Sequence, residues 1–251
     1  MPSGDILSLF GDGGTISSMK TFWLILLCCL IAVTIGENAL HGGTIMALAG
    51  KDSVLLATDS RFSSQQTGPY LLGKHYRTVC RIGKNVLIGC YGLDSDSRLL
   101  VENLRTKFVL HAKDSFQNDY VRKDCNDEPI YHPQSVVRVI SNNLYSSNLA
   151  ISPIIVGLTS DNKPYICSMD GLGAQTLSNT FAISGTSTAS LMAVCEQYFQ
   201  PNLGSSELIQ LAEKCLKLAL QRDVLSGCNV RLYLLTHNSD IIVKDFHTSD
   251  V

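Results

Sequence analysis

The sequence of 251 residues lacks several features that would narrow its function immediately. Charged residues make up only 17% of it and the formal net charge is −2, so nothing indicates nucleic acid or an acidic membrane as a partner. The six histidines are scattered, without an HxxxH pattern or a His/Cys cluster at metal-ligand spacing. We therefore expect no metal site and no cofactor.

The cysteines also lack the spacing of a disulfide framework or a zinc site. There are nine of them and no CxxC occurs. Most fall one at a time in apolar stretches: Cys80, Cys90, Cys167, Cys195, Cys215 and Cys228. Isolated cysteines in such stretches are typical of reduced core residues in an intracellular protein. The lack of an Asn-x-Ser/Thr sequon favours the same interpretation.

One long apolar run is present, close to the N-terminus. Residues 19–36 begin MKTFWLILLCCL and resemble a secretory signal peptide, too short for a comfortable membrane span. Eighteen residues precede Met19, however, and GGTI occurs twice, at Gly13–Ile16 and at Gly42–Ile45. We interpret residues 17–45 as an insertion between duplicated ends, and expect the signal-like run to be non-functional or absent from the main product.

Beyond residue 41 the sequence has no linker, low-complexity tract or large repeat, so we expect an N-terminal extension over 1–41 and one domain over 42–251. Short apolar or alternating runs bounded by turn residues predict strands. These runs are 45–48, 54–58, 86–91, 152–159, 163–170, 181–184, 229–236 and 240–246. Helical spacing predicts helices over 93–114, from Pro133, over 185–198 and from Ser206.

Hairpin strands at both ends of the domain, with helix pairs between them, predict antiparallel sheets covered by helices. Two such sheets stacked face to face would give an α+β fold, a four-layer α/β/β/α sandwich. Residues 115–130 are polar, and we expect a surface loop there.

Five motifs in this order resemble proteasome β-type subunits, over roughly residues 42–251 with an apparent extra stretch around 115–130. The motifs are GGTIMALAGKDSVLLATDSRF, GCYGLDSD, SPIIVGLTSDNKPYICSMDGLG, FAISGT and QRDVLSGCNV. The resemblance implies the N-terminal nucleophile hydrolase fold. In active members a propeptide is removed after a glycine, and the exposed threonine attacks a peptide carbonyl with its own α-amino group as base. A lysine, a buried aspartate, a Ser-Gly and an Asp-x-x-Ser-Gly complete the family's site.

Only some of the family's site residues have a match in this sequence. The matching remnants are Asp59, Ser184, Asp223 and Ser226. The nucleophile position falls on Gly43, while Thr44 lies one residue further along the strand and so points to the opposite face. The lysine position falls near Thr78. We therefore expect no catalytic residue and no intrinsic activity.

The resemblance implies a structural β subunit of the 20S proteasome core, which would contribute to ubiquitin-dependent protein degradation in the cytoplasm and nucleus. Its partners would be other α and β subunits in a 28-subunit, four-ring particle. Two alternatives stay open. Thr44 could be a processed, active nucleophile, or the chain could be a secreted binding protein that starts at Met19.

Overall fold

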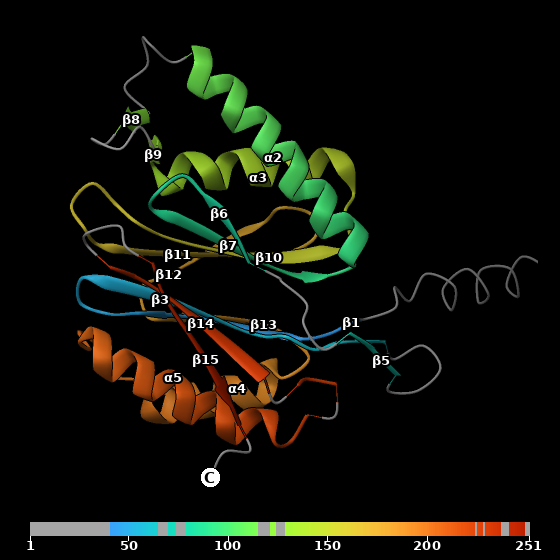
Figure 1. Cartoon of the computed structure of the whole chain (residues 1–251), viewed down its shortest axis with the longest axis vertical. Helices are drawn as coiled ribbons and strands as arrows, with labels where there is room; N and C mark the ends of the chain where they lie inside the picture. The colour runs from blue at the N-terminus through green and yellow to red at the C-terminus, as the bar shows by residue number, and fades with distance from the viewer. Residues whose placement is uncertain are drawn as a thin grey trace, which may run out of the picture. The chain divides into compact units, whose positions relative to one another are not determined.

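Two five-stranded antiparallel sheets lie face to face, with a pair of helices on the outer face of each (Figure 1). The structure, a computed structural model, describes residues 41–64, 70–73, 79–114, 121–123, 129–223, 225–227, 229–236 and 241–248. These all fall within one compact unit, Ala39–Val251. The interpretation of residues 1–40 and the expectation for Thr78 lie outside the described residues.

The first sheet carries helices α2 (Asp94–Asp114) and α3 (Pro133–Ser147). Its strands, in order across the sheet, are β12 (Gln175–Ser178), β11 (Pro164–Met169), β10 (Ile151–Leu158), β7 (Val86–Gly92) and β6 (Val79–Ile82). The predicted pairing of the strands on either side of the Ser160–Lys163 turn is confirmed, since Ile155 lies opposite Cys167.

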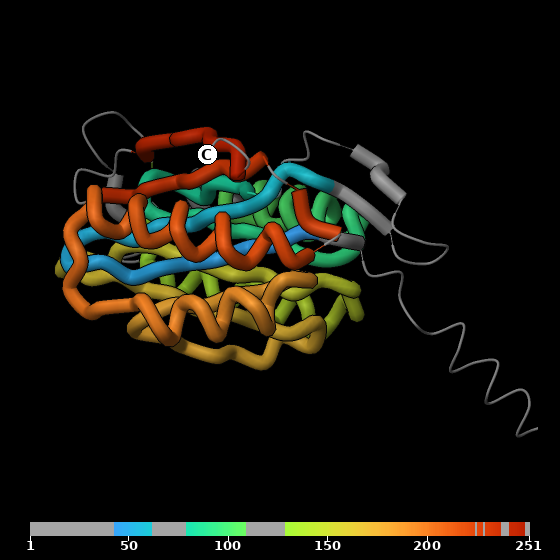
Figure 2. The backbone as a smooth tube through the Cα atoms, turned by 90° about the horizontal axis from the view of Figure 1, so that it is seen from below, coloured from blue at the N-terminus to red at the C-terminus, as the bar shows by residue number. Residues whose placement is uncertain are grey.

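The second sheet carries helices α4 (Thr188–Tyr198) and α5 (Ser205–Leu220), which run side by side across it (Figure 2). Its strands, in order, are β13 (Phe181–Gly185), β2 (Thr44–Ala49), β3 (Ser53–Asp59), β14 (Asn229–Thr236) and β15 (Ile241–His247). The four-layer α/β/β/α sandwich predicted from the sequence is therefore confirmed.

Two small sheets were not predicted. One consists of β1 (His41–Gly42), β4 (Phe62–Ser64) and β5 (Tyr70–Gly73), and the other of β8 (Val121–Lys123) and β9 (Pro129–Tyr131). The segment over 115–130, expected to be a surface loop, therefore contains β8 and the start of β9. Arg122 pairs with Ile130. Backbone hydrogen bonds join these two strands, and such bonds require no alternation of apolar residues that could be recognised in the sequence.

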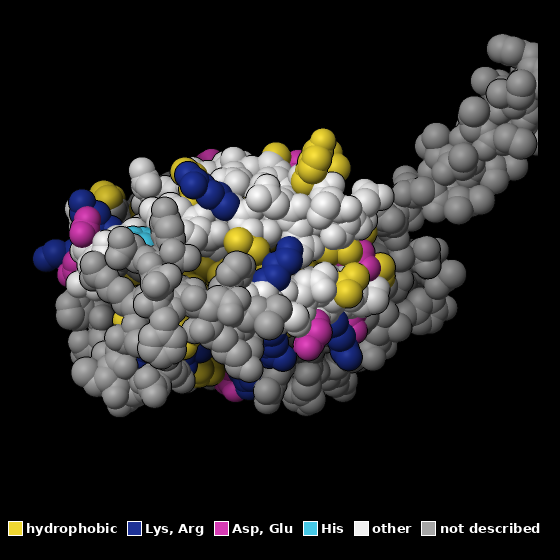
Figure 3. Space-filling model, turned by 90° about the horizontal axis from the view of Figure 1, so that it is seen from above, with side chains coloured by type: hydrophobic (Ala, Val, Ile, Leu, Met, Phe, Trp, Pro, Cys, Tyr) yellow, Lys and Arg dark blue, Asp and Glu magenta, His cyan; other side chains and the backbone are white. Residues whose placement is uncertain are grey.

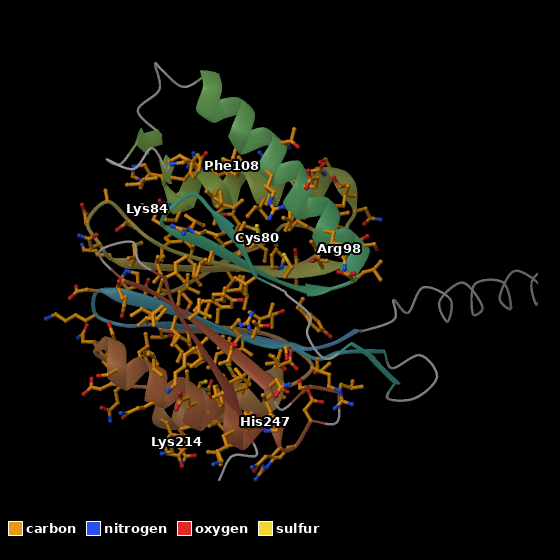
Figure 4. All side chains as sticks on the ribbon, viewed as in Figure 1. Cys80, Lys84, Arg98, Phe108, Lys214 and His247 are labelled. Carbon is orange, nitrogen blue, oxygen red and sulfur yellow. The ribbon has the colours of Figure 1, made fainter. Side chains whose placement is uncertain are left out.

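Strand periodicity divides the core into three layers. All six residues of β2 are buried, but successive side chains point to opposite faces of the sheet. Ile45 and Ala47 lie in the cluster between the sheets, whereas Met46 and Leu48 lie in the cluster under α4 and α5. A third cluster lies between the other sheet and α2 and α3. Side chains fill all three spaces (Figure 4).

The helices present the expected apolar faces, with one exception. On α3, Val136, Val137, Ile140 and Leu144 lie at helical spacing and are all buried. Helix α5 begins one residue before the predicted Ser206. Ile209, although it lies at the apolar spacing of α5, is only partly buried at the edge of the core. Leu208, Leu211 and Cys215 are buried instead, so the apolar stripe is wider on that side.

The outer surface over α2 and α3 is mixed. Basic, acidic and isolated hydrophobic side chains lie interspersed on the described part of that face (Figure 3). This distribution agrees with the small net charge of −2. Among the described helices, none is long and apolar enough to cross a bilayer.

Candidate functional site

The predicted site residues come from segments far apart in the sequence that meet at the start of β2. The β2–β3 hairpin brings Ile45 opposite Thr58, so Thr44 lies beside Asp59 at the end of β3. On the other side of β2, Gly185 at the end of β13 lies opposite Thr44. The turn after α5 supplies residues 225–227, which close the site from the third direction.

Asp59 joins two of these segments through its carboxyl group. Its side chain is buried, with Oδ1 accepting a hydrogen bond from the Thr44 amide at 3.0 Å and Oδ2 accepting one from the Gly227 amide at 2.8 Å. Burial raises the pKa of Asp59 to about 7, although both amide hydrogen bonds act in the opposite direction. The residue is therefore a buried acid that titrates near neutral pH.

Asp223 gathers three hydroxyl groups on one oxygen. Its Oδ2 accepts hydrogen bonds from Thr186 at 2.5 Å and from Ser187 and Ser226 at 2.6 Å each. Oδ1 accepts a further hydrogen bond from the Leu225 amide at 2.9 Å. Partial burial raises the pKa of Asp223, but the hydroxyl and amide donors outweigh it and hold the pKa below its ordinary value. This carboxylate is ionised at neutral pH.

Thr44 extends the hydroxyl cluster by one member. Its side chain is buried, and its Oγ1 lies 2.7 Å from Ser226 Oγ. Because the Ser226 hydroxyl donates to Asp223, it accepts from Thr44, giving the relay Thr44 to Ser226 to Asp223. The relay ends on a carboxylate of low pKa, which is a poor acceptor for a proton at neutral pH.

Gly43 lies directly beside the carboxyl of Asp59. A Cβ atom built on Gly43 would be 3.4 Å from Asp59 Oδ1, but the Gly43 φ of 153° is one that side-chain-bearing residues rarely adopt. The Gly43 carbonyl accepts a hydrogen bond from the Thr186 amide at 3.0 Å. Gly185 permits this approach, since a Cβ there would lie 2.3 Å from the Gly43 oxygen.

Some members of this cluster were predicted from the sequence and others were not. Ser184 does not join it, because its hydroxyl donates instead to the Ser152 carbonyl of the facing sheet at 3.4 Å. Thr186 and Ser187, which the sequence analysis did not single out, take part through their hydroxyl groups. Their signal in the sequence is weak, since they are only the two hydroxyl residues that follow the Ser-Gly pair.

The site is held from its outer side by Arg61. Its Nη1 donates to the Ser226 carbonyl at 3.3 Å, and a Cβ on Gly227 would be 2.4 Å from the Arg61 Cβ. Within the described ranges, no three His, Cys, Asp or Glu side chains gather as metal ligands would. The hydrogen-bond donors described for Asp59 and Asp223 are backbone amides and hydroxyl groups. The arrangement ties three segments of the chain together through hydrogen bonds.

Comparison with known proteins gives a consistent result. The family model "Proteasome subunit" matches residues 39–235. The chain is similar to "Proteasome subunit beta type-3-B" of Arabidopsis thaliana, with 30% identity over 78% of this chain and 90% of that protein. It is 29% identical to "Probable proteasome subunit beta type-3" of Schizosaccharomyces pombe, over 78% of this chain and 90% of the relative. It is 28% identical to "Proteasome subunit beta type-3" of Saccharomyces cerevisiae, over 83% of this chain and 95% of that protein.

Proposed function

The chain belongs to the proteasome subunit family, and we propose that it is a non-catalytic structural β subunit of the 20S proteasome core. The observation that carries this proposal is the position of Gly43. It lies beside the buried carboxyl of Asp59, where the family's attacking hydroxyl belongs, and it has no side chain.

The chemistry of the neighbouring threonine supports the same proposal. A hydroxyl is a weak nucleophile at pH 7 unless a base stands next to it. In the uncut chain the nitrogen of Thr44 is a peptide amide that donates to Asp59, so it cannot act as that base. The hydroxyl itself donates towards Asp223, an ionised carboxylate of low pKa.

The Thr78 position is the second part of the proposal. By resemblance to active subunits, a lysine would be needed near residue 78, and the sequence has threonine there. We propose that both losses, at Gly43 and at Thr78, leave Asp59, Ser184, Asp223 and Ser226 as remnants that now stabilise the fold.

A subunit without its own activity would contribute through its place in the assembled particle. We infer that it assembles with other α and β subunits into a 28-subunit, four-ring particle, through heterologous contacts that close a ring. In that position it would enclose the proteolytic chamber and contribute to ubiquitin-dependent protein degradation in the cytoplasm and nucleus.

An active subunit with Thr44 as nucleophile is the second candidate. The contact of 2.7 Å between Thr44 Oγ1 and Ser226 Oγ favours it, because it connects Thr44 to the site's carboxylate. Under this reading, the chain would be cleaved between Gly43 and Thr44 and the new amino group would supply the base.

Two substitutions at Thr44 separate the candidates. Thr44→Val removes the hydroxyl at nearly constant volume, and Thr44→Ser retains it. We expect particles isolated through a tag on either variant to keep every peptidase activity of the wild-type particle, with native mass spectrometry confirming assembly. A threonine-directed covalent inhibitor should label other subunits but not this chain. Loss of one activity in Thr44→Val alone, with assembly intact, would support the active candidate instead.

A further inference from the structure

The mixed surface over α2 and α3 changes character beyond the middle of α3. Residues 139–160 and 171–195 contain no Asp, Glu, Lys, Arg or His. The C-terminal half of α3, most of the turn between β11 and β12, and β12 itself fall within these two stretches. The turn begins with Asp170. These three pieces therefore supply no charged side chain other than Asp170.

Three large hydrophobic side chains are exposed on these pieces. Tyr145 on α3 is 82% exposed, Leu172 in the turn is 66% exposed and Leu177 on β12 is 62% exposed. Leu177 lies opposite Cys167 of β11, whose side chain is buried in the cluster beneath α2 and α3. Because paired residues of antiparallel strands point to the same face, Leu177 points to the side of the sheet on which α3 lies.

The turn that carries Leu172 packs against α3. The Ser141 hydroxyl donates to the Gly173 carbonyl at 2.7 Å, and Leu172 directly precedes Gly173. Tyr145 follows Ser141 by one helical turn and so lies on the same face of α3. Tyr145, Leu172 and Leu177 therefore lie on one side of the first sheet. A single exposed leucine is ordinary, but three large apolar groups on an uncharged surface indicate a binding surface.

The conformation of the turn is fixed by its own hydrogen bonds. Asp170 Oδ1 accepts from the Leu172 amide at 2.9 Å and from the Ala174 amide at 2.8 Å. The Asp170 carbonyl accepts from the Gly173 amide at 3.1 Å, and the Gly173 φ of 82° favours glycine. Leu172 is held in an exposed position, so little conformational entropy is lost when a partner covers it.

We propose that Tyr145, Leu172 and Leu177 form an interaction surface, which an uncharged, apolar surface of another subunit covers in the assembled particle. The proposal rests on the proposed function. It adds the face of the chain through which one neighbour binds and the side chains that anchor the contact.

The chemistry of this surface selects the occupant. Nucleic acid and anionic membranes require basic side chains, which residues 139–160 and 171–195 lack. The centres of protein interfaces are depleted of charge and enriched in tyrosine. The partner's matching surface should also be uncharged, because a buried ion without a partner is strongly unfavourable. A different subunit is favoured over a second copy, since a ring closed by heterologous contacts joins unlike surfaces.

The test follows incorporation of the tagged full-length chain into the particle in its own cells. We expect Leu172→Glu and Tyr145→Glu each to reduce the tagged chain recovered in the particle by roughly tenfold or more, because the contact would bury an unpaired carboxylate. Native mass spectrometry measures this amount. In the wild type, amide hydrogen exchange over residues 171–178 should be slower in the particle than in the isolated chain.

Matched substitutions make the result specific. Leu172→Met and Tyr145→Phe should be incorporated like the wild type, because they keep the apolar area. Leu99→Glu should also be incorporated, since Leu99 is 49% exposed but lies on α2 between Arg98 and Glu102 in a charged stretch. Urea unfolding of the isolated chains should give the same stability for Leu172→Glu as for the wild type, within about 0.5 kcal/mol. A loss of incorporation then reports on binding and not on folding.

The outcomes separate this proposal from the proposed function. Incorporation of the wild type together with full incorporation of Leu172→Glu and Tyr145→Glu would overturn this proposal and leave the proposed function intact. Absence of the wild-type chain from the particle would contradict the proposed function itself. A dimer of the isolated chain that Leu172→Glu abolishes would assign the surface to a second copy, and binding of the isolated chain to neutral lipid vesicles would assign it to lipid. Either of these two results would overturn the proposal.

Discussion

Asp59 shows how a single carboxyl group can be both a structural tie and a source of pH dependence. It joins the start of β2 to the turn after α5 through the amides of Thr44 and Gly227. Two amide donors do not fully replace the water that burial removes, and so the pKa rises from 3.8 to about 7. The negative charge of Asp223 acts in the same direction, and the positive charge of Arg61 opposes it.

The first prediction at this scale concerns stability against pH. Because the folded state holds the Asp59 proton more tightly than the unfolded state, the group's contribution is fully present below pH 4 and is lost as pH rises to about 7. The difference between the two pKa values corresponds to about 4 kcal/mol. Denaturant unfolding of the full-length chain between pH 5 and 8 should show stability falling with pH.

Asp59→Asn should flatten this dependence, because the carboxamide does not titrate. It also turns one amide donor towards a backbone amide, so its stability should be lower than that of the wild type at pH 5. Asp52→Asn, on the exposed turn between β2 and β3, is the control and should keep the wild-type slope. A slope that persists unchanged in Asp59→Asn would assign the pH dependence to another group.

At the scale of elements, α3 shows how burial alternates sharply along one helix. Its Leu144 is 0% exposed and packs in the cluster with Ile140 and Phe108, whereas the next residue, Tyr145, is 82% exposed. Pro133 occupies the first turn, where the missing N–H costs nothing. Asn148, in the left-handed conformation, ends the helix by donating its amide to the Leu144 carbonyl.

These two neighbours provide a matched pair of substitutions. Leu144→Ala should reduce the free energy of unfolding by about 2–5 kcal/mol, because it leaves a cavity between the helix and the sheet. Tyr145→Ala should change it by less than about 0.5 kcal/mol, because the ring contacts mainly water. Urea unfolding of both variants at one pH measures the difference. Equal losses of the free energy of unfolding in the two variants would mean that Tyr145 contributes to packing despite its exposure.

At the scale of the whole molecule, the described core is divided into three apolar layers, and the middle one holds the sheets together. It contains small residues such as Ala47, Ala49 and Ala182, which let the strands approach closely. The outer two layers join each sheet to its own helices. The site lies at the start of β2, so its geometry depends on the middle layer and on the layer under α5.

Overfilling the middle layer should therefore affect the whole fold. Ala47→Leu adds carbon atoms between the sheets and should reduce stability by about 1–3 kcal/mol. The control is Ala193→Leu on the exposed face of α4, which should leave stability within about 0.5 kcal/mol of the wild type. Thermal unfolding of both variants measures this. A tolerated Ala47→Leu would indicate that the space between the sheets is not closely packed.

The sequence by itself determined the order of the main strands and helices, because each carries its own periodicity. Alternation or short apolar runs marked eight strands, namely β2, β3, β7, β10, β11, β13, β14 and β15, and helical spacing marked α2 to α5. It also located Asp59, Asp223 and Ser226 through their motifs, and the structure brings all three close to Thr44. Such patterns can be recognised in the sequence because they depend only on which face of a helix or strand is apolar.

Only the tertiary structure decided which groups meet. Thr186 and Ser187, which follow β13, join Asp223, whereas the Ser184 hydroxyl, within β13, donates to the facing sheet. The β8–β9 ribbon was also not predicted, because each of its strands is held by hydrogen bonds to the other strand and not by a pattern within its own polar segment. Such contacts depend on distances between elements, and no pattern within one element encodes them.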